Sequence, residues 1–151
     1  MTRIDFYILE SAEGSTSNYQ QAAEIFICRL TEKAWLQNNT VYIHAVDEQH
    51  AIKLDELMWV FNPASFIPHQ LPPFNANENT VLIGHSSTTE TPVSHHDVLI
   101  NLHPDTPSFF SQFERVAEII TADETSRIKG RERYQFYRDR GYALETHKLS
   151  L

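Results

Sequence analysis

Residues 41–61, VYIHAVDEQHAIKLDELMWVF, decide the fold class of this chain. The first six are nearly all apolar or β-branched, which is typical of a strand buried on both faces of a sheet. Asp47 follows directly and is a good N-cap for a helix that extends to about Phe61. A strand that leads straight into a helix is the repeating unit of an α/β fold. The apolar residues of this helix recur at helical spacing and are Ile52, Leu54, Leu57, Met58 and Phe61.

The same alternation continues on both sides of this unit. We predict strands over residues 4–9, 80–83 and 97–102, a short extended segment over 65–69, and helices over 18–37, 107–120 and 122–140. Polar loops are expected at 11–17 and 86–94, and a tail from Gly141. Strands alternating with helices favour a parallel sheet covered on both sides. We therefore predict one α/β domain over residues 1–151, with a mainly parallel sheet and helices on both faces.

Charge is distributed unevenly along the 151 residues. The formal net charge is -8, so the chain as a whole is unsuited to coating nucleic acid. Six of the 12 lysines and arginines nevertheless fall between Arg127 and Arg140. No apolar run is long enough for a membrane span, and Asp5 stands where a signal peptide would be apolar. A single cysteine, Cys28, excludes an internal disulfide and fits a reducing cytoplasm. We expect its thiol to be buried in the core, and we expect the protein to be cytoplasmic and to have no membrane contact.

Residue patterns for catalysis are weak. The first strand-to-helix loop, residues 10–18, contains one glycine and two glutamates, whereas a phosphate-binding loop needs glycines and no negative charge. His95 and His96 could both bind a metal only in a loop, and we interpret them as a solvated pair. His44 and His69 are interpreted as structural or surface residues. We therefore expect no catalytic residues, metal or cofactor. The alternative is a flavodoxin-like enzyme that binds a nucleotide or metal.

The last predicted helix carries a basic face. Arg127, Arg131, Tyr134 and Arg138 are spaced at i, i+4, i+7 and i+11, so they share one side of a helix, whereas Arg133 lies off it. Guanidinium groups around an aromatic ring suit a carboxylate or an acidic peptide with an apolar end. They could also bind phosphates, and a simply solvated helix remains the alternative.

Residues 54–69, LDELMWVFNPASFIPH, form a second candidate surface. Aromatic residues are enriched in protein interfaces, and Trp59 lies between two further apolar residues, so one helix cannot bury them all against a core. Part of this stretch is therefore expected to face a partner. The alternative is ordinary core packing at the end of a helix.

These stretches resemble the chi subunit of bacterial DNA polymerase III. The similarity runs in collinear order through most of the chain, except for residues 72–96. No single motif is specific, but the set is specific at these spacings and this length. The matching segments are DFYIL at 5–9, DEQHA at 47–51, LDE at 54–56 with Trp59, SFIPH at 65–69, DVLINL at 97–102, and RERY at 131–134 with Tyr137 and Arg138.

The resemblance implies a Rossmann-like domain without a nucleotide site. It also implies an adaptor in the clamp loader, which binds the psi subunit and the acidic, phenylalanine-ending C-terminal tail of single-stranded-DNA-binding protein, so that DNA is contacted indirectly. In some members a helicase is thought to use the psi surface. Gln135 stands where relatives can carry a lysine, so the tail site is expected to be less basic here. Carried over by position, the tail site comprises Arg131, Arg127, Tyr134, Arg138 and Ile120, and the psi surface comprises Trp59, Phe66 and Pro68.

Overall fold

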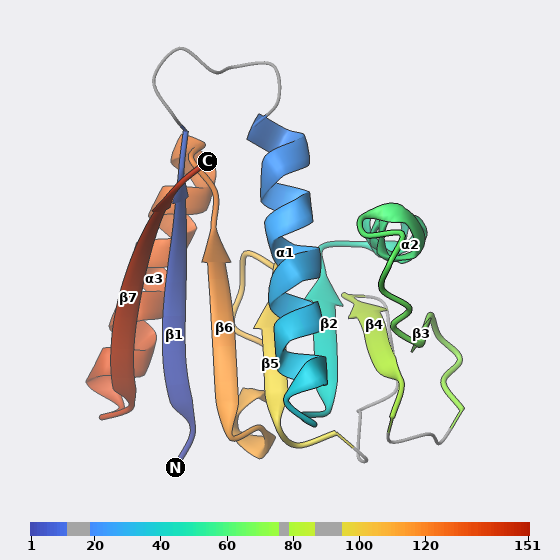
Figure 1. Cartoon of the computed structure of the whole chain (residues 1–151). Coiled ribbons are helices and arrows are strands. Elements are labelled where there is room, and N and C mark those ends of the chain that lie inside the picture. Colours follow the sequence, from blue (N-terminus) through green and yellow to red (C-terminus); the bar gives the residue numbers. More distant parts are fainter. Residues whose placement is uncertain (12–18, 76–78, 87–94) are drawn as a thin grey trace.

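The computed structural model describes residues 1–11, 19–75, 79–86 and 95–151. In this part of the chain, seven strands form one sheet in the order β3-β4-β2-β5-β6-β1-β7, and all neighbours are parallel (Figure 1). The predicted parallel α/β sheet is confirmed. Its strands are β1 (Arg3–Glu10), β2 (Val41–Ala45), β3 (His69–Gln70), β4 (Val81–His85), β5 (Val98–Asn101), β6 (Arg115–Ile120) and β7 (Ala143–Ser150).

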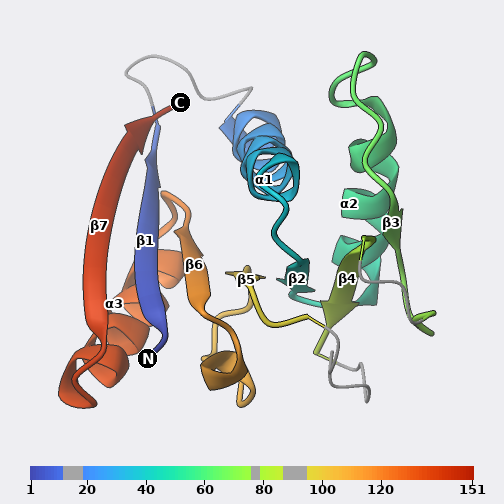
Figure 2. The ribbon, with the colours of Figure 1, turned by 60° about the horizontal axis from the view of Figure 1, so that its bottom comes forward.

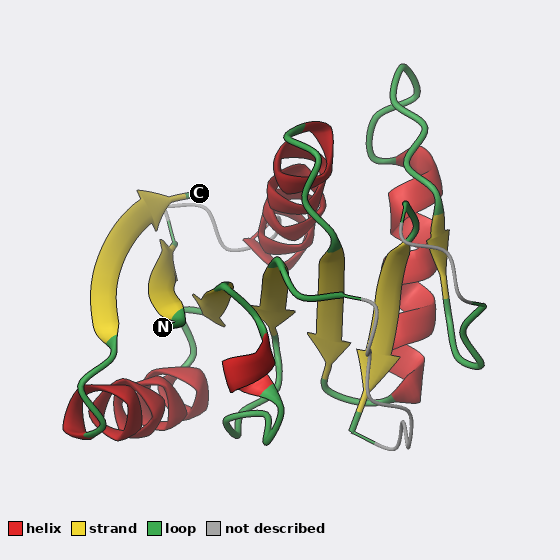
Figure 3. Ribbon diagram, turned by 90° about the horizontal axis from the view of Figure 1, so that it is seen from below, coloured by secondary structure: helices red, strands yellow, loops and turns green. Residues whose placement is uncertain are grey.

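Helices cover both faces of the sheet, as predicted. The helices α1 (Tyr19–Leu36) and α2 (Glu48–Val60) lie on one face, and α3 (Glu124–Asp139) lies on the other (Figures 2 and 3). Each face has its own buried apolar cluster: Ile43 packs with Leu54 on the first face, and Phe6 packs with Tyr137 on the second. The sheet thus separates two cores, and each core supports a different part of the surface.

Local sequence fixes where the helices begin and end. Asp47 caps α2, because its carboxylate accepts a hydrogen bond of 2.8 Å from the His50 amide. Asp123 caps α3 in the same way through the Ser126 amide at 3.0 Å. At the other end of α3, Gly141 has a φ of 79°, which ends the helix at little steric cost because glycine lacks a Cβ.

The helix predicted over residues 107–120 is wrong. This segment contains a short 3₁₀ turn, η1 (Phe110–Gln112), followed by strand β6. Its apolar residues match helical spacing, but residues 116–120 of β6 are all buried, including Glu118. A helix on the surface would bury one side only, whereas a strand between β1 and β5 is covered on both faces. Tertiary position therefore overrides the helical spacing.

The C-terminal tail predicted from Gly141 is also wrong, because it contains β7. This strand pairs with β1 from Arg3↔Ala143 to Glu10↔Ser150 and forms one edge of the sheet. Most of its side chains are exposed or partly exposed, so the sequence lacks the apolar alternation of a core strand. At the opposite edge, the segment predicted over 65–69 contributes only His69 to β3. Most residues of the loops expected at 11–17 and 86–94 lie outside the described part of the chain.

Candidate binding surfaces

The basic side of α3 borders a pocket of about 390 Å³. Arg127, Arg131 and Tyr134 line it, so the structure brings together three of the four helix residues selected from the sequence. Both guanidinium-bearing residues are exposed, whereas Tyr134 is partly buried. Arg138 is exposed as well, but it is not among the residues that line the pocket. The pocket therefore presents positive charge beside an aromatic ring.

The floor of this pocket is apolar and comes from the sheet. Phe6 and Ile8 of β1 lie beside Ile120 of β6, so the fifth residue expected at the tail site lines the same pocket, although it is on a strand rather than a helix. The Tyr134 ring packs edge-on against Phe6 at a centroid distance of 5.3 Å. This combination suits a ligand that has an anionic group next to an apolar one.

Gly130 allows α3 to lie close to this floor. A Cβ built at this position would be 2.5 Å from Cδ1 of Ile120, so any larger residue would displace that side chain. A glycine inside a helix is unfavourable by about 1 kcal/mol relative to alanine, and its presence therefore indicates a close contact. A glycine inside the predicted helix is visible in the sequence, and it could have indicated that this side of the helix packs closely against another element.

A buried ionic network fixes α3 on the sheet. Glu118 of β6 accepts hydrogen bonds from Arg133 Nε at 2.9 Å, Tyr137 Oη at 2.7 Å and Asn101 Nδ2 at 2.9 Å. Arg133 also donates to the carbonyl of Pro104 at 2.6 Å. Burial raises the pKa of Glu118, and the charge of Arg133 partly offsets this rise. Arg133 lies off the basic face, as expected from its spacing, but it is buried and structural.

The aromatic surface consists of Trp59, Val60, Phe66 and Pro68, at the end of α2 and in the segment before β3. Trp59 is 51% exposed, Phe66 is 69% exposed, and their ring centroids are 5.4 Å apart. Pro68 is partly buried, and Val60 is exposed. Two of the residues that the resemblance assigns to the psi surface, Trp59 and Phe66, thus lie side by side and exposed, and the exposed Val60 was not among the assigned residues.

His69 holds this aromatic surface in place. Its ring lies 4.4 Å from the Trp59 ring, and its two nitrogens contact the carbonyls of Ile67 at 2.7 Å and Asp55 at 3.0 Å. His69 is therefore a structural residue, as interpreted from the sequence. The result is an exposed apolar surface with rigid support, which is typical of protein interfaces.

Cys28 and His44, two side chains with potential chemical reactivity, are buried in the fold. Cys28 is buried, as predicted, and burial raises its pKa to about 12, so the thiol stays protonated. Burial lowers the pKa of His44 to about 4, with smaller contributions from His103 and His85. The interpretation of His95 and His96 as a solvated pair is wrong for His95, which is fully buried and contacts the Thr80 carbonyl at 2.8 Å. The two histidines lie in the segment before β5, where the ring of His95 is buried and that of His96 is exposed.

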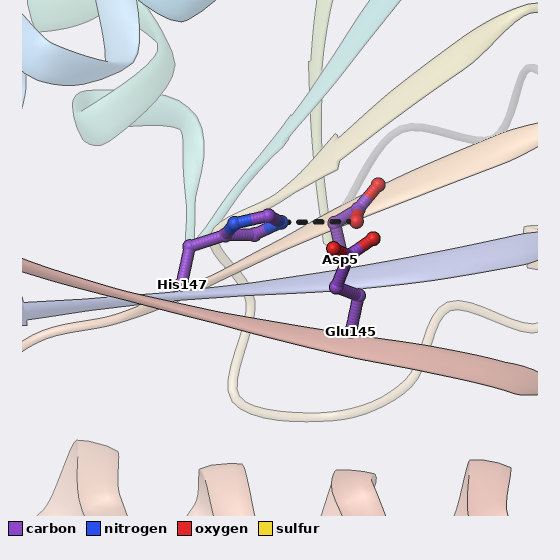
Figure 4. A group of neighbouring side chains, drawn as sticks. All are labelled: Asp5, Glu145 and His147. Carbon is purple, nitrogen blue, oxygen red and sulfur yellow. Dashed lines mark hydrogen bonds and ion pairs between the residues drawn. The ribbon is translucent and has the colours of Figure 1, made fainter.

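Asp5, Glu145 and His147 form the densest group of potential metal ligands among the described residues (Figure 4). Asp5 is buried and already contacts Arg115 Nε at 2.8 Å and His147 Nε2 at 3.2 Å. Arg3 also pairs with Asp5 and Glu145. Because cationic side chains already balance these carboxylates, we assign the group as an ion-pair network that fastens β7 to β1.

Comparison with solved structures identifies the fold type. The chain superposes on T4 UvsW with a TM-score of 0.71 at 10% identity, covering 99% of this chain and 42% of that one. It superposes on domain 2 of the Mss116p DEAD-box helicase, solved with an RNA duplex, with a TM-score of 0.60 at 11% identity, covering 97% and 65%. At such low identity the likeness shows the fold alone. No described helix is long and apolar enough to cross a membrane.

Comparison of sequences is more specific. The family model described as "DNA polymerase III chi subunit, HolC" matches residues 1–145. The DNA polymerase III subunit chi of Pseudomonas aeruginosa is 42% identical over 149 residues, covering 99% of this chain and 98% of that protein. The subunits chi of Haemophilus influenzae (29% over 144 residues, 95% of each chain) and Escherichia coli (28% over 156 residues, 97% of each chain) match as well. By this nearly full-length agreement, the chain belongs to the DNA polymerase III chi subunit family.

Proposed function

We propose that this chain is a non-catalytic adaptor that connects the psi subunit of the clamp loader to the C-terminal tail of single-stranded-DNA-binding protein. The observation that carries the proposal is the pocket beside α3. Its floor of Phe6, Ile8 and Ile120 suits a terminal aromatic ring, while Arg127 and Arg131 suit a terminal carboxylate and acidic side chains. An acidic tail that ends in phenylalanine offers both groups within one residue.

The aromatic surface is the proposed site for psi. Trp59 and Phe66 are large and exposed, and Pro68 adjoins them, so a partner that covered them would remove a large apolar area from water. A helicase would have to compete for the same side chains. Psi is the occupant proposed here, because the family places this subunit in the polymerase holoenzyme.

The positions of the two surfaces fit an adaptor. The pocket is lined by residues of α3, β6, β1 and β7, whereas the aromatic surface is formed by the end of α2 and the segment before β3. Figure 1 shows β7 and β3 at opposite edges of the sheet. Partners of ordinary size can therefore bind together without overlapping. In this proposal the protein acts in the cytoplasm during DNA replication and reaches DNA only through the single-stranded-DNA-binding protein.

Titration of a labelled peptide with the tail sequence tests the pocket. Losing a charge-assisted contact costs about 1.5–3 kcal/mol, so Arg131→Ala should weaken binding about tenfold to a hundredfold. Arg29→Ala is the matched control, because Arg29 is exposed on α1 on the opposite face and removal of its side chain changes the net charge equally. Failure of the unmodified protein to bind, or equal losses in the two variants, would contradict the proposed tail site.

A further inference from the structure

The β7 wall of the pocket carries a cation of its own. Lys148 stands opposite Ile8 in the register of β7 with β1, and Ile8 stands opposite Ile120 in the register of β1 with β6. All three line the pocket, so they form one row across its floor. Parallel strands are about 4.8 Å apart, which places the backbone of Lys148 about 10 Å from that of Ile120.

The course of α3 covers the Ile120 end of this row and leaves its Lys148 end exposed. Near the middle of the helix, Gly130 packs on Ile120 of β6, and after the end of the helix Gly141 leads into the start of β7. The helix therefore crosses the sheet obliquely, and the later part of β7, with Thr146 and Lys148, faces the pocket instead of the helix. Cations thus border the apolar floor from two directions: from α3 and from β7.

The charges of the pocket are available to a ligand. Within the described residues, Arg127, Arg131 and Lys148 form no ion pair, whereas the buried Arg133 and the strand residues Arg3 and Arg115 do. In a chain with a formal net charge of -8, unpaired cations around one apolar pocket favour an anionic ligand.

One carboxylate opposes this charge. Glu10 follows Ile8 by two residues on β1, so the two side chains lie on the same face, and Glu10 also lines the pocket. Among the described residues that line the pocket, it is the only acidic one, and it would repel an acidic ligand. The rim is therefore polarised, with a positive charge on β7 and a negative one at the end of β1.

We propose that Lys148 binds an acidic side chain of the tail upstream of its last residue, and that Glu10 lowers affinity for the same acidic segment. This inference rests on the proposed tail site, and it adds recognition of the acidic residues that precede the terminal residue of the tail. Arg127 and Arg131 hold the end of the peptide, whereas Lys148 distinguishes an acidic approach from a neutral one.

Two peptides separate these roles: the tail sequence, and a version in which the upstream acidic residues become amides and the last residue is unchanged. Lys148→Gln should weaken the acidic peptide about two- to fivefold, the range of an exposed ion pair, and should leave the neutral peptide unaffected. Glu10→Gln should strengthen binding of the acidic peptide by a similar factor. Arg29→Gln is the control for net charge, and circular dichroism checks that each variant is folded.

The outcomes distinguish this inference from the proposed function. Equal effects of Lys148→Gln on both peptides, or no effect on either, would overturn the role of Lys148. If Arg131→Ala still weakened binding about tenfold or more in that case, the tail site itself would stand. If the unmodified protein bound neither peptide, both proposals would fail together. Weaker binding of the acidic peptide to Glu10→Gln would show that Glu10 supports the site instead of opposing its ligand.

Discussion

Substituting Arg133 by alanine should destabilise the fold far more than its place on a basic helix suggests. Arg133 and Glu118 are 5% and 0% exposed. Removing the guanidinium leaves the Glu118 carboxylate in the core with only the neutral donors Tyr137 and Asn101. Breaking a buried ion pair from one side commonly costs about 3–5 kcal/mol, a large part of the total stability of a domain.

The pH dependence of this loss is a sharper test than its size. Without Arg133, the pKa of Glu118 in the folded protein should rise further above its ordinary value of 4.5, because burial is then opposed by hydrogen bonds alone. A raised carboxylate pKa favours the protonated folded state. Stability is therefore retained below the ordinary pKa and lost as pH rises toward the folded pKa, by up to about 1.4 kcal/mol per pH unit.

Urea denaturation followed by circular dichroism, at pH 5 and at pH 8, measures both effects. The penalty of Arg133→Ala should be smaller at pH 5, and adding Glu118→Gln should recover part of the stability at pH 8. A loss below about 1 kcal/mol that does not change with pH would refute the coupling of these two residues. Arg138→Ala is the control, because Arg138 is exposed on the same helix and its removal changes the net charge equally.

Three further predictions concern other parts of the chain. Trp59→Ala should weaken psi binding by about 2 kcal/mol or more, with tail binding nearly unchanged. Equal loss of both partners together with a lowered melting temperature would instead show that Trp59 acts through the stability of the fold. Titration with flavin mononucleotide or ATP should give no saturable heat at sub-millimolar concentration, and a clear isotherm would revive the enzyme alternative. Burial raises the pKa of Asp5, but the hydrogen bonds from Arg115 and His147 outweigh this effect, so the pKa lies below its ordinary value of 3.8. The stabilisation from this network should therefore be lost as pH falls through the acidic range. Asp5→Asn should flatten that pH dependence of stability in acid denaturation.

The sequence predicted those elements whose local pattern agrees with their place in the fold. The strand at 41–46 and the helix capped by Asp47 are both in the structure, because a doubly buried strand and a capped amphipathic helix have distinct periods. The strand β6 was missed because its apolar residues also fit a helical period. Only its place between two other strands, which the local sequence does not encode, decides between the two.

The residues of the candidate sites likewise divide into those that local spacing groups and those that only long-range contacts bring together. Helical spacing was enough to group Arg127, Arg131 and Tyr134, which line one pocket. It could not reveal Lys148, because an edge strand with polar side chains resembles a tail in sequence. Nor could it reveal that Arg133 is buried, since its partner Glu118 lies on a strand whose apolar spacing also predicts a helix. Contacts between distant segments were therefore the missing information.

The arrangement of the two surfaces has a thermodynamic consequence for an adaptor. The outermost strands of the sheet, β3 and β7, are six strand spacings apart, or about 29 Å. Coupling between sites requires an element with two alternative arrangements, and the central strands β2 and β5, which separate the two surfaces, are buried and paired on both edges. Binding at the pocket should therefore leave affinity at the aromatic surface unchanged. An adaptor of this kind raises the effective concentration of its two partners relative to each other by holding them in one complex. It does not need to change shape to do so.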